Sequence, residues 1–283
     1  MRVDMHVHSK LSRRPSVWVL QKIGCAESYT ETEQLHRIAR ARGMDAVTIT
    51  DHNVLCSEVA ALPDTFSGVE VTTYFPEDGC KLHVLVYNLN AEQFAEIERV
   101  RPSVYDLVPF LNQEGLFHAL AHPFYAVSDH YRLSHFEKTL LLFEHFELNG
   151  DQSREVNELL RQILAGLNPE AVDRLAERHR LPVCGDQPWT KGLIGGSDDH
   201  SSMNIGRAWT EVRGALNLTS FFTGLRQRRG IPGFASEAGP QSMAHTIYSV
   251  AYQFYRARFE FAGREDEPLG RFLERLLSSR PGL

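Results

Sequence analysis

Residues 4–8 read Asp-Met-His-Val-His, and this short stretch predicts both a strand and the chemistry at its end. His6 and His8 stand two residues apart in an apolar alternation, the pattern of a β-strand in which alternate side chains point to the same face. Two imidazoles on one face can share a metal ion. A single pair of this kind is as often two satisfied or exposed histidines, so its meaning depends on the rest of the chain.

Imidazoles and carboxylates recur at the ends of other strand-like runs. These runs span residues 46–50, 68–72, 83–87, 116–121, 143–148 and 193–196. The side chains at run ends that could ligate a metal ion are Asp51, His52, Glu70, His83, His122, Asp198 and His200. Strands that alternate with helices predict parallel βα units, whose carboxyl ends meet on the face where barrel active sites are built.

Helical patterns fill the intervals between the runs. They predict helices over residues 31–42, 91–99, 104–114, 153–165, 169–180 and 218–229. The first of them begins near Thr30, where Thr-x-x-Glu precedes an apolar periodicity as in a capping box. Gly43 is expected to end it.

Burial and register refine the set of candidates. Glu70 stands among apolar neighbours, where an unpaired carboxylate is costly and a bridging metal ion removes the cost. A partly exposed glutamate on a short strand is the alternative. Asp198 and His200 share one strand face, so Asp199 should point away and support the backbone. Histidines without a strand-end position are expected to be surface or packing residues: His36, His130, His135, His145, His179 and His245.

The motif series of the PHP (polymerase and histidinol phosphatase) superfamily is similar to what this chain carries, in order, over residues 4–200: DMHVH, TDH, GVE, LHVL, AHP and SDDH. The resemblance implies an α/β fold, a distorted (β/α)7 TIM-like barrel of the PHP type, with a cleft that binds two or three divalent metal ions. The segment FELNG also resembles a family element, and no ligand role follows for its Glu147 and Asn149.

The resemblance also implies which side chains hold each ion. The first ion would lie among His6, His8, Glu70 and Asp198. The second would lie among Glu70, His83 and His122, so that Glu70 is the bridge. The third would be held by His52 and His200.

One position departs from the family. Many relatives carry an acid five residues after the two histidines, or a histidine slightly further on, and this side chain completes the third metal site; here the place is taken by Arg13. A cation cannot ligate a metal ion. Arg13, with Lys10, is therefore expected to contact a substrate phosphate, for which a guanidinium is well suited. Two alternatives stay open: His52 and His200 bind the third ion with Asp51 or water, or the basic residues form only a solvated loop.

The ligand set predicts hydrolysis of a phosphate ester by a metal-activated hydroxide. Imidazole mixed with carboxylate suits Mn, Zn or Fe without choosing among them. Two ions about 3.5–4 Å apart lower the pKa of a bridging water and stabilise charge on phosphoryl oxygens. Asp51 would orient a ligand histidine or accept a proton, while Arg13 and Glu70 would act on the substrate and at the bridge. The substrate would be a phosphomonoester or a nucleotide or oligonucleotide phosphodiester.

Two other functions compete with this one. Amidohydrolase barrels also begin with two histidines at the end of the first strand, but they usually supply a lysine at a middle strand, and no lysine ends any strand predicted here. A non-catalytic PHP module that binds a partner is the second alternative. Retention of nearly every ligand position argues against it.

Composition sets the domain plan. The 283 residues predict one metal-dependent phosphoesterase domain over 1–231 and a helical extension over 232–283, because Pro232 and Gly233 open a loop. Aromatic residues in the extension indicate packing against the barrel or against a second subunit in a homo-oligomer.

Charge and cysteine content narrow the partners and the compartment. A net charge of -6 argues against a protein that coats nucleic acid, and leaves a small phosphorylated substrate or a short nucleic acid end. The four cysteines are widely spaced, which favours a reducing cytoplasm. Apolar runs far shorter than about 20 residues predict no membrane span.

Overall fold

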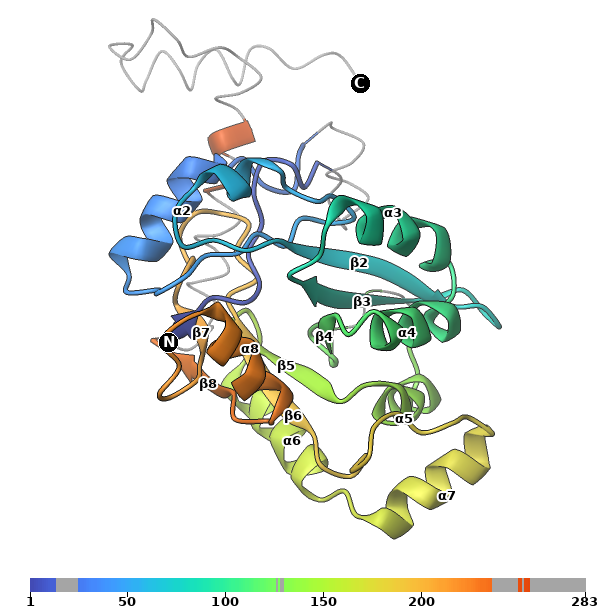
Figure 1. Cartoon of the computed structure of the whole chain (residues 1–283). Helices are drawn as coiled ribbons and strands as arrows, with labels where there is room; N and C mark the ends of the chain where they lie inside the picture. The colour runs from blue at the N-terminus through green and yellow to red at the C-terminus, as the bar shows by residue number, and fades with distance from the viewer. Residues whose placement is uncertain (14–24, 126, 128–129, 236–248, 251, 255–283) are drawn as a thin grey trace, which may run out of the picture.

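The computed structural model describes residues 1–13, 25–125, 127, 130–235, 249–250 and 252–254 (Figure 1). Most of the extension predicted over 232–283 lies outside these residues, as do Arg14 and His245. Any oligomer contact through the extension therefore stays a prediction. Within the described part of the chain, no helix is both long and apolar enough to cross a bilayer.

Five strands form the main sheet, in the order β2-β3-β4-β5-β6. They are β2 (Gly68–Phe75), β3 (Cys80–Tyr87), β4 (Phe117–Leu120), β5 (His145–Asn149) and β6 (Gly192–Gly196). Strand β3 is antiparallel to both of its neighbours, whereas β4, β5 and β6 are parallel. The prediction of parallel βα units throughout the sheet was therefore wrong for β3. The turn over residues 76–79 is too short for the crossover that a parallel connection needs, and Gly79 adopts φ 70° within it.

A second sheet of order β1-β7-β8 lies beside the main one. It contains β1 (Arg2–Val3), β7 (Ala208–Glu211) and β8 (Ile231–Phe234). Strand β8 pairs with β7 and lies across the predicted domain boundary, so residues 231–234 pack with the body of the protein.

Segments 4–8 and 46–52 lie between the two edge strands of the main sheet, β6 and β2, and are connected to both sides by backbone contacts. Strands were expected over residues 3–7 and 46–50, but beyond β1 these segments make only isolated bridges. Thr50 N–H donates to the Val7 carbonyl at 2.9 Å, which joins the two segments. Their outer neighbours are reached by two parallel bridges, Val7 with Asp199 and His52 with Glu70. The overall class is α/β.

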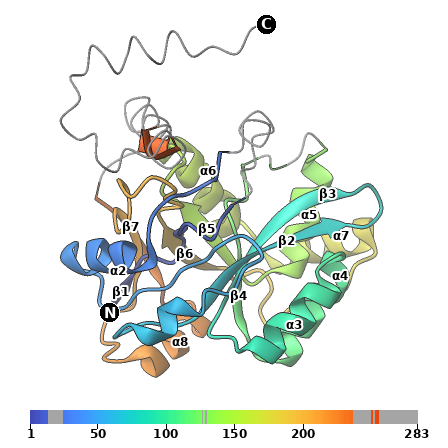
Figure 2. The ribbon, with the colours of Figure 1, turned by 90° about the horizontal axis from the view of Figure 1, so that it is seen from above.

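Helices surround the sheets: those within residues 91–179 pack against one face of the main sheet, whereas those at residues 32–41 and 218–226 pack in two other cores (Figure 2). They are α2 (Thr32–Ala41), α3 (Ala91–Val100), α4 (Val104–Gln113), α5 (Leu133–Leu142), α6 (Arg154–Ala165), α7 (Pro169–His179) and α8 (Leu218–Arg226), with a 3-10 turn at Glu58–Ala61. The six helices predicted between residues 31 and 229 are all present. Helix α5 was missed because its apolar end runs directly into β5.

The start of α2 differs from the prediction, although its end does not. Its N-cap is Glu31, and no described side chain caps it. The Thr30 hydroxyl lies instead 2.6 Å from that of Ser202. Gly43 has φ 83°, as expected of a residue that ends a helix.

Alternate side chains of a strand face opposite sides of the sheet, and on β3 this places His83 on the inner side. On β3, Val84 and Val86 pack towards the helices, in a core that also holds α3 and α4. Leu85 and Tyr87 face the opposite side, in a core with Met5. His83 has the same parity as Leu85, so it projects to this inner side.

Candidate metal centre

Glu70, on β2, lies fully buried at the centre of a group of histidines. Its Oε1 is 2.8 Å from His83 Nδ1 and 3.0 Å from His122 Nε2. Its Oε2 is 3.2 Å from the Nε2 atoms of both His6 and His8. Oε2 also lies 3.0 Å from His52 Nδ1. The two carboxylate oxygens therefore face different imidazoles, two at Oε1 and three at Oε2, which is the arrangement that a bridging ligand requires.

The first pair of imidazoles has the spacing of a metal site. His6 Nε2 and His8 Nε2 are 3.0 Å apart, and each is 3.3 Å from Asp198 Oδ1. Ligand atoms about 2.0–2.1 Å from a tetrahedral ion are roughly 3.3 Å from one another. His6, His8, Glu70 and Asp198 therefore fit one ion of that size.

Hydrogen bonds behind these imidazoles fix which nitrogen carries the proton. His6 Nδ1 lies 2.8 Å from Glu147 Oε1, which can only accept when ionised. His8 Nδ1 lies 3.0 Å from Ser12 Oγ, and that hydroxyl donates to Asp51 Oδ1 at 2.8 Å. Both Nδ1 atoms are thus donors, and both Nε2 atoms present lone pairs to one another. This is repulsive unless a cation, a proton or a metal ion, lies between them.

The electrostatic balance of the cluster favours cations. Burial lowers the pKa of His6, but the charges of Asp198, Glu147 and Glu70 outweigh it and hold that pKa well above its ordinary value. Burial would raise the pKa of Glu70, yet the nearby histidines, His52 first, hold it well below the usual range. Without metal the cluster takes up protons, and metal binding releases them.

The second pair of imidazoles leaves buried nitrogens unsatisfied. Within the described residues, neither His83 Nδ1 nor His122 Nδ1 has a hydrogen-bond partner, although His83 Nδ1 is 2.8 Å from Glu70 Oε1. Burial lowers the pKa of His83 to about 4, so its imidazole is neutral and can act as a ligand. His122 has φ 28°, and its N–H donates to Glu147 Oε2 at 2.8 Å. Glu147 therefore holds both His6 and the loop that carries His122.

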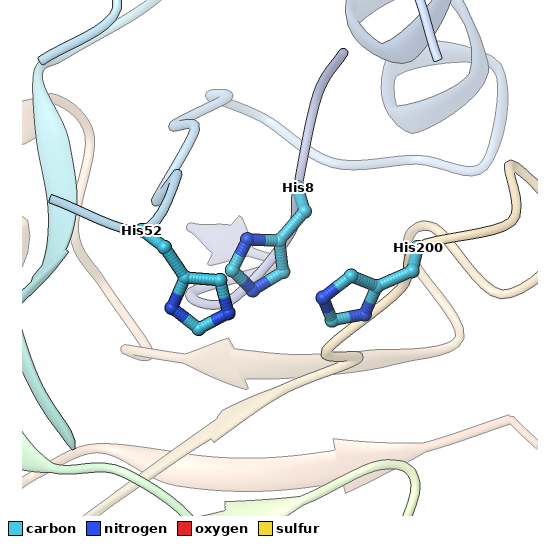
Figure 3. Close-up of side chains that lie close together, drawn as sticks. All are labelled: His8, His52 and His200. Atoms are coloured by element: carbon cyan, nitrogen blue, oxygen red, sulfur yellow. The ribbon is translucent and has the colours of Figure 1, made fainter. Parts of the chain in front are cut away.

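His52 and His200 form a third group together with His8 (Figure 3). The ring centroid of His8 is 4.7 Å from that of His52 and 4.1 Å from that of His200. His200 Nδ1 donates to the Asp198 carbonyl at 2.9 Å, so its Nε2 is the atom available to a ligand. All eight side chains predicted as metal ligands thus lie in one cluster.

Glu27 is an acid that the sequence analysis missed. Its Oε2 is 3.2 Å from His52 Nε2, and its Oε1 is 3.8 Å from His200 Nε2. Burial raises the pKa of Glu27, but His52, His200 and His8 outweigh it and lower that pKa to about 2. An anionic carboxylate therefore lies beside His52 and His200. The only signal in the sequence was an acid in the loop between the first two motifs, and that loop has no periodicity to place it.

The basic residues and Asp51 lie around the cluster in different ways. Arg13 is exposed, and Lys10 Nζ is 2.5 Å from Glu31 Oε2 at the surface. Asp51 is buried and accepts hydrogen bonds from Ser9 N–H and Oγ, at 2.8 and 2.6 Å, besides the bond from Ser12. Asp51 thus reaches His8 through a hydroxyl, which fits orientation of a histidine better than proton transfer.

Two residues of uncertain role prove to be supports. Asn149 Nδ2 donates to Glu147 Oε2 at 3.1 Å and to Asp198 Oδ2 at 3.0 Å, which links β5 to the Asp198 loop. Asp199 Oδ1 accepts from Ser201 Oγ at 2.7 Å and from Asn204 N–H at 3.0 Å. Asp199 therefore braces its own loop.

A second cluster with metal-ligating side chains, Asp78, Cys80 and His135, does not fit a metal ion. His135 Nδ1 accepts from Arg132 N–H at 3.1 Å, so its Nε2 carries a proton and faces Asp78 Oδ2 at 3.0 Å. Burial raises the pKa of Cys80 to about 11, which keeps it a thiol.

Comparison with known proteins gives distant likenesses. No family model matches the chain. A stretch of 73 residues is 34% identical to the uncharacterized protein MJ1587 of Methanocaldococcus jannaschii, and the match covers 25% of this chain and 40% of that protein, less than half its length.

The solved structures that are similar to this chain are equally distant. PsfC from Pseudomonas syringae PB-5123 has a TM-score of 0.49 at 17% identity, over 89% of this chain and 97% of that one. A two-domain protein from Bacteroides vulgatus ATCC 8482, which contains a predicted PHP-like metal-dependent phosphoesterase, has a TM-score of 0.43 at 15% identity, over 88% and 69%. Likenesses of this degree assign neither fold nor activity, so the function has to be argued from the residues of the cluster.

Proposed function

We propose that this chain is a metal-dependent phosphoesterase of the PHP superfamily that hydrolyses a phosphate ester. The observation that carries the proposal is the position of Glu70, whose Oε1 faces His83 and His122 and whose Oε2 faces His6, His8 and His52. A carboxylate that bridges two groups of imidazoles suits a two-ion hydrolytic site.

The fold that we propose is a distorted (β/α)7 barrel. Segments 4–8 and 46–52 would be two of the seven barrel strands, and β2 to β6 would be the other five. Two backbone hydrogen bonds support closure: Thr50 N–H to the Val7 carbonyl at 2.9 Å, and Asp198 N–H to the His6 carbonyl at 2.7 Å.

We assign the ions, which are Mn, Zn or Fe, to three ligand groups. The first two groups follow the division of Glu70: His6, His8 and Asp198 share one of its oxygens, and His83 and His122 share the other. The third group consists of His52, His200 and Glu27. In this assignment Glu27 replaces the acid that relatives carry at the position of Arg13.

When bound, such ions supply an acidified water and positive charge for the phosphoryl oxygens. The chain's own residues prepare for both. Glu147, and Asp51 through Ser12, keep the Nε2 lone pairs of His6 and His8 directed at the centre. Asp51 is poorly placed to accept the proton that a bound water would lose. Ser9 N–H, Ser9 Oγ and Ser12 Oγ already donate hydrogen bonds to its two oxygens.

Charge explains why the substrate needs the ions. The carboxylates of Glu27, Asp51, Glu70, Glu147 and Asp198 crowd the centre and would repel a phosphate dianion. Compensation by divalent ions reverses this field. Arg13 and Lys10, outside the buried cluster, would contact the phosphate, and Lys10 would exchange Glu31 for it.

The substrate is a small phosphorylated molecule or a short nucleic acid end, and the compartment is the cytoplasm, which the four free cysteines favour. The decisive experiment screens phosphomonoesters and short oligonucleotides with Mn and Zn, beside elemental analysis of the purified protein. Glu70→Gln should abolish most turnover and lower the number of bound ions, with Glu96→Gln, whose carboxylate pairs with Arg99 on the surface of α3, as the matched control. Near-normal turnover in Glu70→Gln, or an untreated folded protein with fewer than two ions, refutes the proposal.

Arg13→Ala tests the basic loop by itself. Loss of a charge-assisted phosphate contact should lower kcat/KM by roughly one to two orders of magnitude, with metal content unchanged. Parent-like kinetics would mean that the loop is only a solvated segment.

A further inference from the structure

The loop between β6 and β7 carries Asp198 and His200 in a strained conformation. Asp198 and Ser202, neither of which is glycine, adopt φ 53° and φ 67°. Left-handed residues of this kind persist only where the surrounding structure over-determines them. The orientation of His200 therefore depends on whatever holds this loop from outside.

Two anchors come from the N-terminal part of the chain. Asp198 N–H donates to the His6 carbonyl at 2.7 Å, which fixes the start of the loop. The hydroxyls of Ser202 and Thr30 are 2.6 Å apart, which ties the far side of His200 to the residue before α2. The imidazole donates from Nδ1 to the carbonyl of Asp198 in its own loop, and its ring stacks on that of His8, with the centroids 4.1 Å apart.

The third anchor comes from the C-terminal part of the chain. Residues 249–250 and 252–254 are helical and are drawn in red in Figure 1. Ser249 Oγ donates to the Ser201 carbonyl at 2.9 Å, and Gln253 Nε2 reaches the same carbonyl at 3.3 Å and Ser249 Oγ at 3.1 Å. These two side chains stand one helical turn apart on one face. They converge on the carbonyl of Ser201, the residue that follows His200.

We infer that Ser249 and Gln253 are positioning residues for the third ion: by binding the Ser201 carbonyl they keep His200 beside Glu27 and His52. The inference rests on the proposed function, because it presupposes the third ion. It assigns a task to the C-terminal segment, which otherwise contributes no side chain to the described metal cluster.

Coupling of this kind acts in both directions. If docking of residues 249–254 strengthens the third site, occupation of that site must strengthen the docking by the same factor. Metal binding should therefore slow hydrogen exchange at residues 249–254. A segment that merely covers the surface would not respond in this way.

The experiment uses the full chain and compares Ser249→Ala/Gln253→Leu with Tyr252→Ala, a control on the same segment whose side chain is 52% exposed. Competition with a metal chelator measures the dissociation constant of each ion. The double variant should bind the third ion about tenfold more weakly, the scale of two partly exposed hydrogen bonds, and the first two ions as the parent does. Hydrogen exchange of residues 249–254 should slow on saturation with Mn in the parent and in the control, but not in the double variant.

The outcomes separate this inference from the proposed function. A parent that binds three ions, beside a double variant with the same third dissociation constant, overturns the positioning role alone. A parent that binds fewer than three ions overturns the three-ion centre and the positioning role with it. If the double variant does not fold, Gln253→Leu keeps the Ser249 hydroxyl and should show a smaller loss at the same site, whereas parent-like affinity in that variant overturns the role of Gln253.

Discussion

Glu147→Gln is the substitution whose effect the geometry defines most closely. Three donors converge on the Glu147 carboxylate: His6 Nδ1 at 2.8 Å, His122 N–H at 2.8 Å and Asn149 Nδ2 at 3.1 Å. A glutamine offers one acceptor oxygen. Two of the donors, including a backbone N–H that cannot turn away, face Oε2, so the glutamine oxygen goes there and its amide NH2 faces His6.

The consequence for His6 is a change of tautomer. A donor opposite Nδ1 forces the imidazole proton to Nε2, or leaves two buried donors opposed at a cost of about 1–3 kcal/mol. In either case the Nε2 lone pair loses its support as a ligand. Loss of such an outer partner typically weakens metal binding about 10–100-fold, which is about 1.4–2.7 kcal/mol. The ion among His6, His8, Glu70 and Asp198 should therefore be the one that weakens.

The assay is chelator competition with Mn and with Zn, beside thermal unfolding of the metal-free proteins. Glu144→Gln is the matched control, because this residue lies three positions earlier and its carboxylate pairs with Arg228 at 2.8 Å instead. The control should bind metal as the parent does. If Glu147→Gln folds and binds every ion with parental affinity, the carboxylate does not hold the tautomer of His6 and the reasoning fails.

Three further predictions test other parts of the centre. Glu27→Gln should weaken the third ion at least tenfold and leave two ions bound, whereas Glu31→Gln should not; calorimetric titration with Mn checks this, and three tight ions in Glu27→Gln would exclude Glu27 as a ligand. Metal affinity should rise with pH above 6.5, because the pKa values of His6 and His8 are raised and protons therefore compete with the ion. The stability that these histidines give to the metal-free protein is fully present below pH 6.5 and is lost as pH rises through their folded-state pKa values. A chelator series over about pH 6 to 8.5 measures the affinity, and a flat profile would contradict the first expectation. Gly196→Ala should destabilise the protein by about 1–3 kcal/mol in thermal unfolding, because the added Cβ would lie 2.4 Å from His6 Cβ and 2.5 Å from His6 N. The control Gly166→Ala, whose Cβ would lie 3.3 Å from its nearest neighbour, should have a much smaller effect, and equal melting temperatures of the two variants would refute the steric argument.

The residues on regular strands could be placed from the sequence because parity is a local property. Glu70 and His83 on their strands, and His6 and His8 on an extended segment with the same alternation, reach the inner side because the neighbouring apolar residues fill the outer side. Parity also places Glu147 and Asn149 on that side of β5, where both are buried. It could not show that Glu147 hydrogen-bonds a proposed ligand, His6, while Glu70 is itself a proposed ligand, because that difference is set by distances between strands that are remote in the sequence.

The direction of β3 and the position of Glu27 depended on connections that carry no periodic signal. The turn at residues 76–79 interrupts two apolar runs without a helix between them, and only the missing helix indicated a reversal. Glu27 lies nineteen residues after His8 in an irregular loop, so a count along the sequence led to Arg13 instead.

The same loop shows why the proposed third site follows from contacts between residues and not from spacing along the sequence. A ligand on a strand is held by the pairing of its neighbours, so its place in the motif is fixed by the ladder. A ligand on a loop needs only an anchor that brings it back, and here Glu27 N–H and Ser28 N–H both donate to the Ser12 carbonyl, at 3.1 and 3.3 Å. Ser12 in turn binds His8 and Asp51. The loop can therefore vary in length between the two motifs and still return its acid to the histidines, because what has to be kept is the anchor at Ser12 and not the number of residues before it.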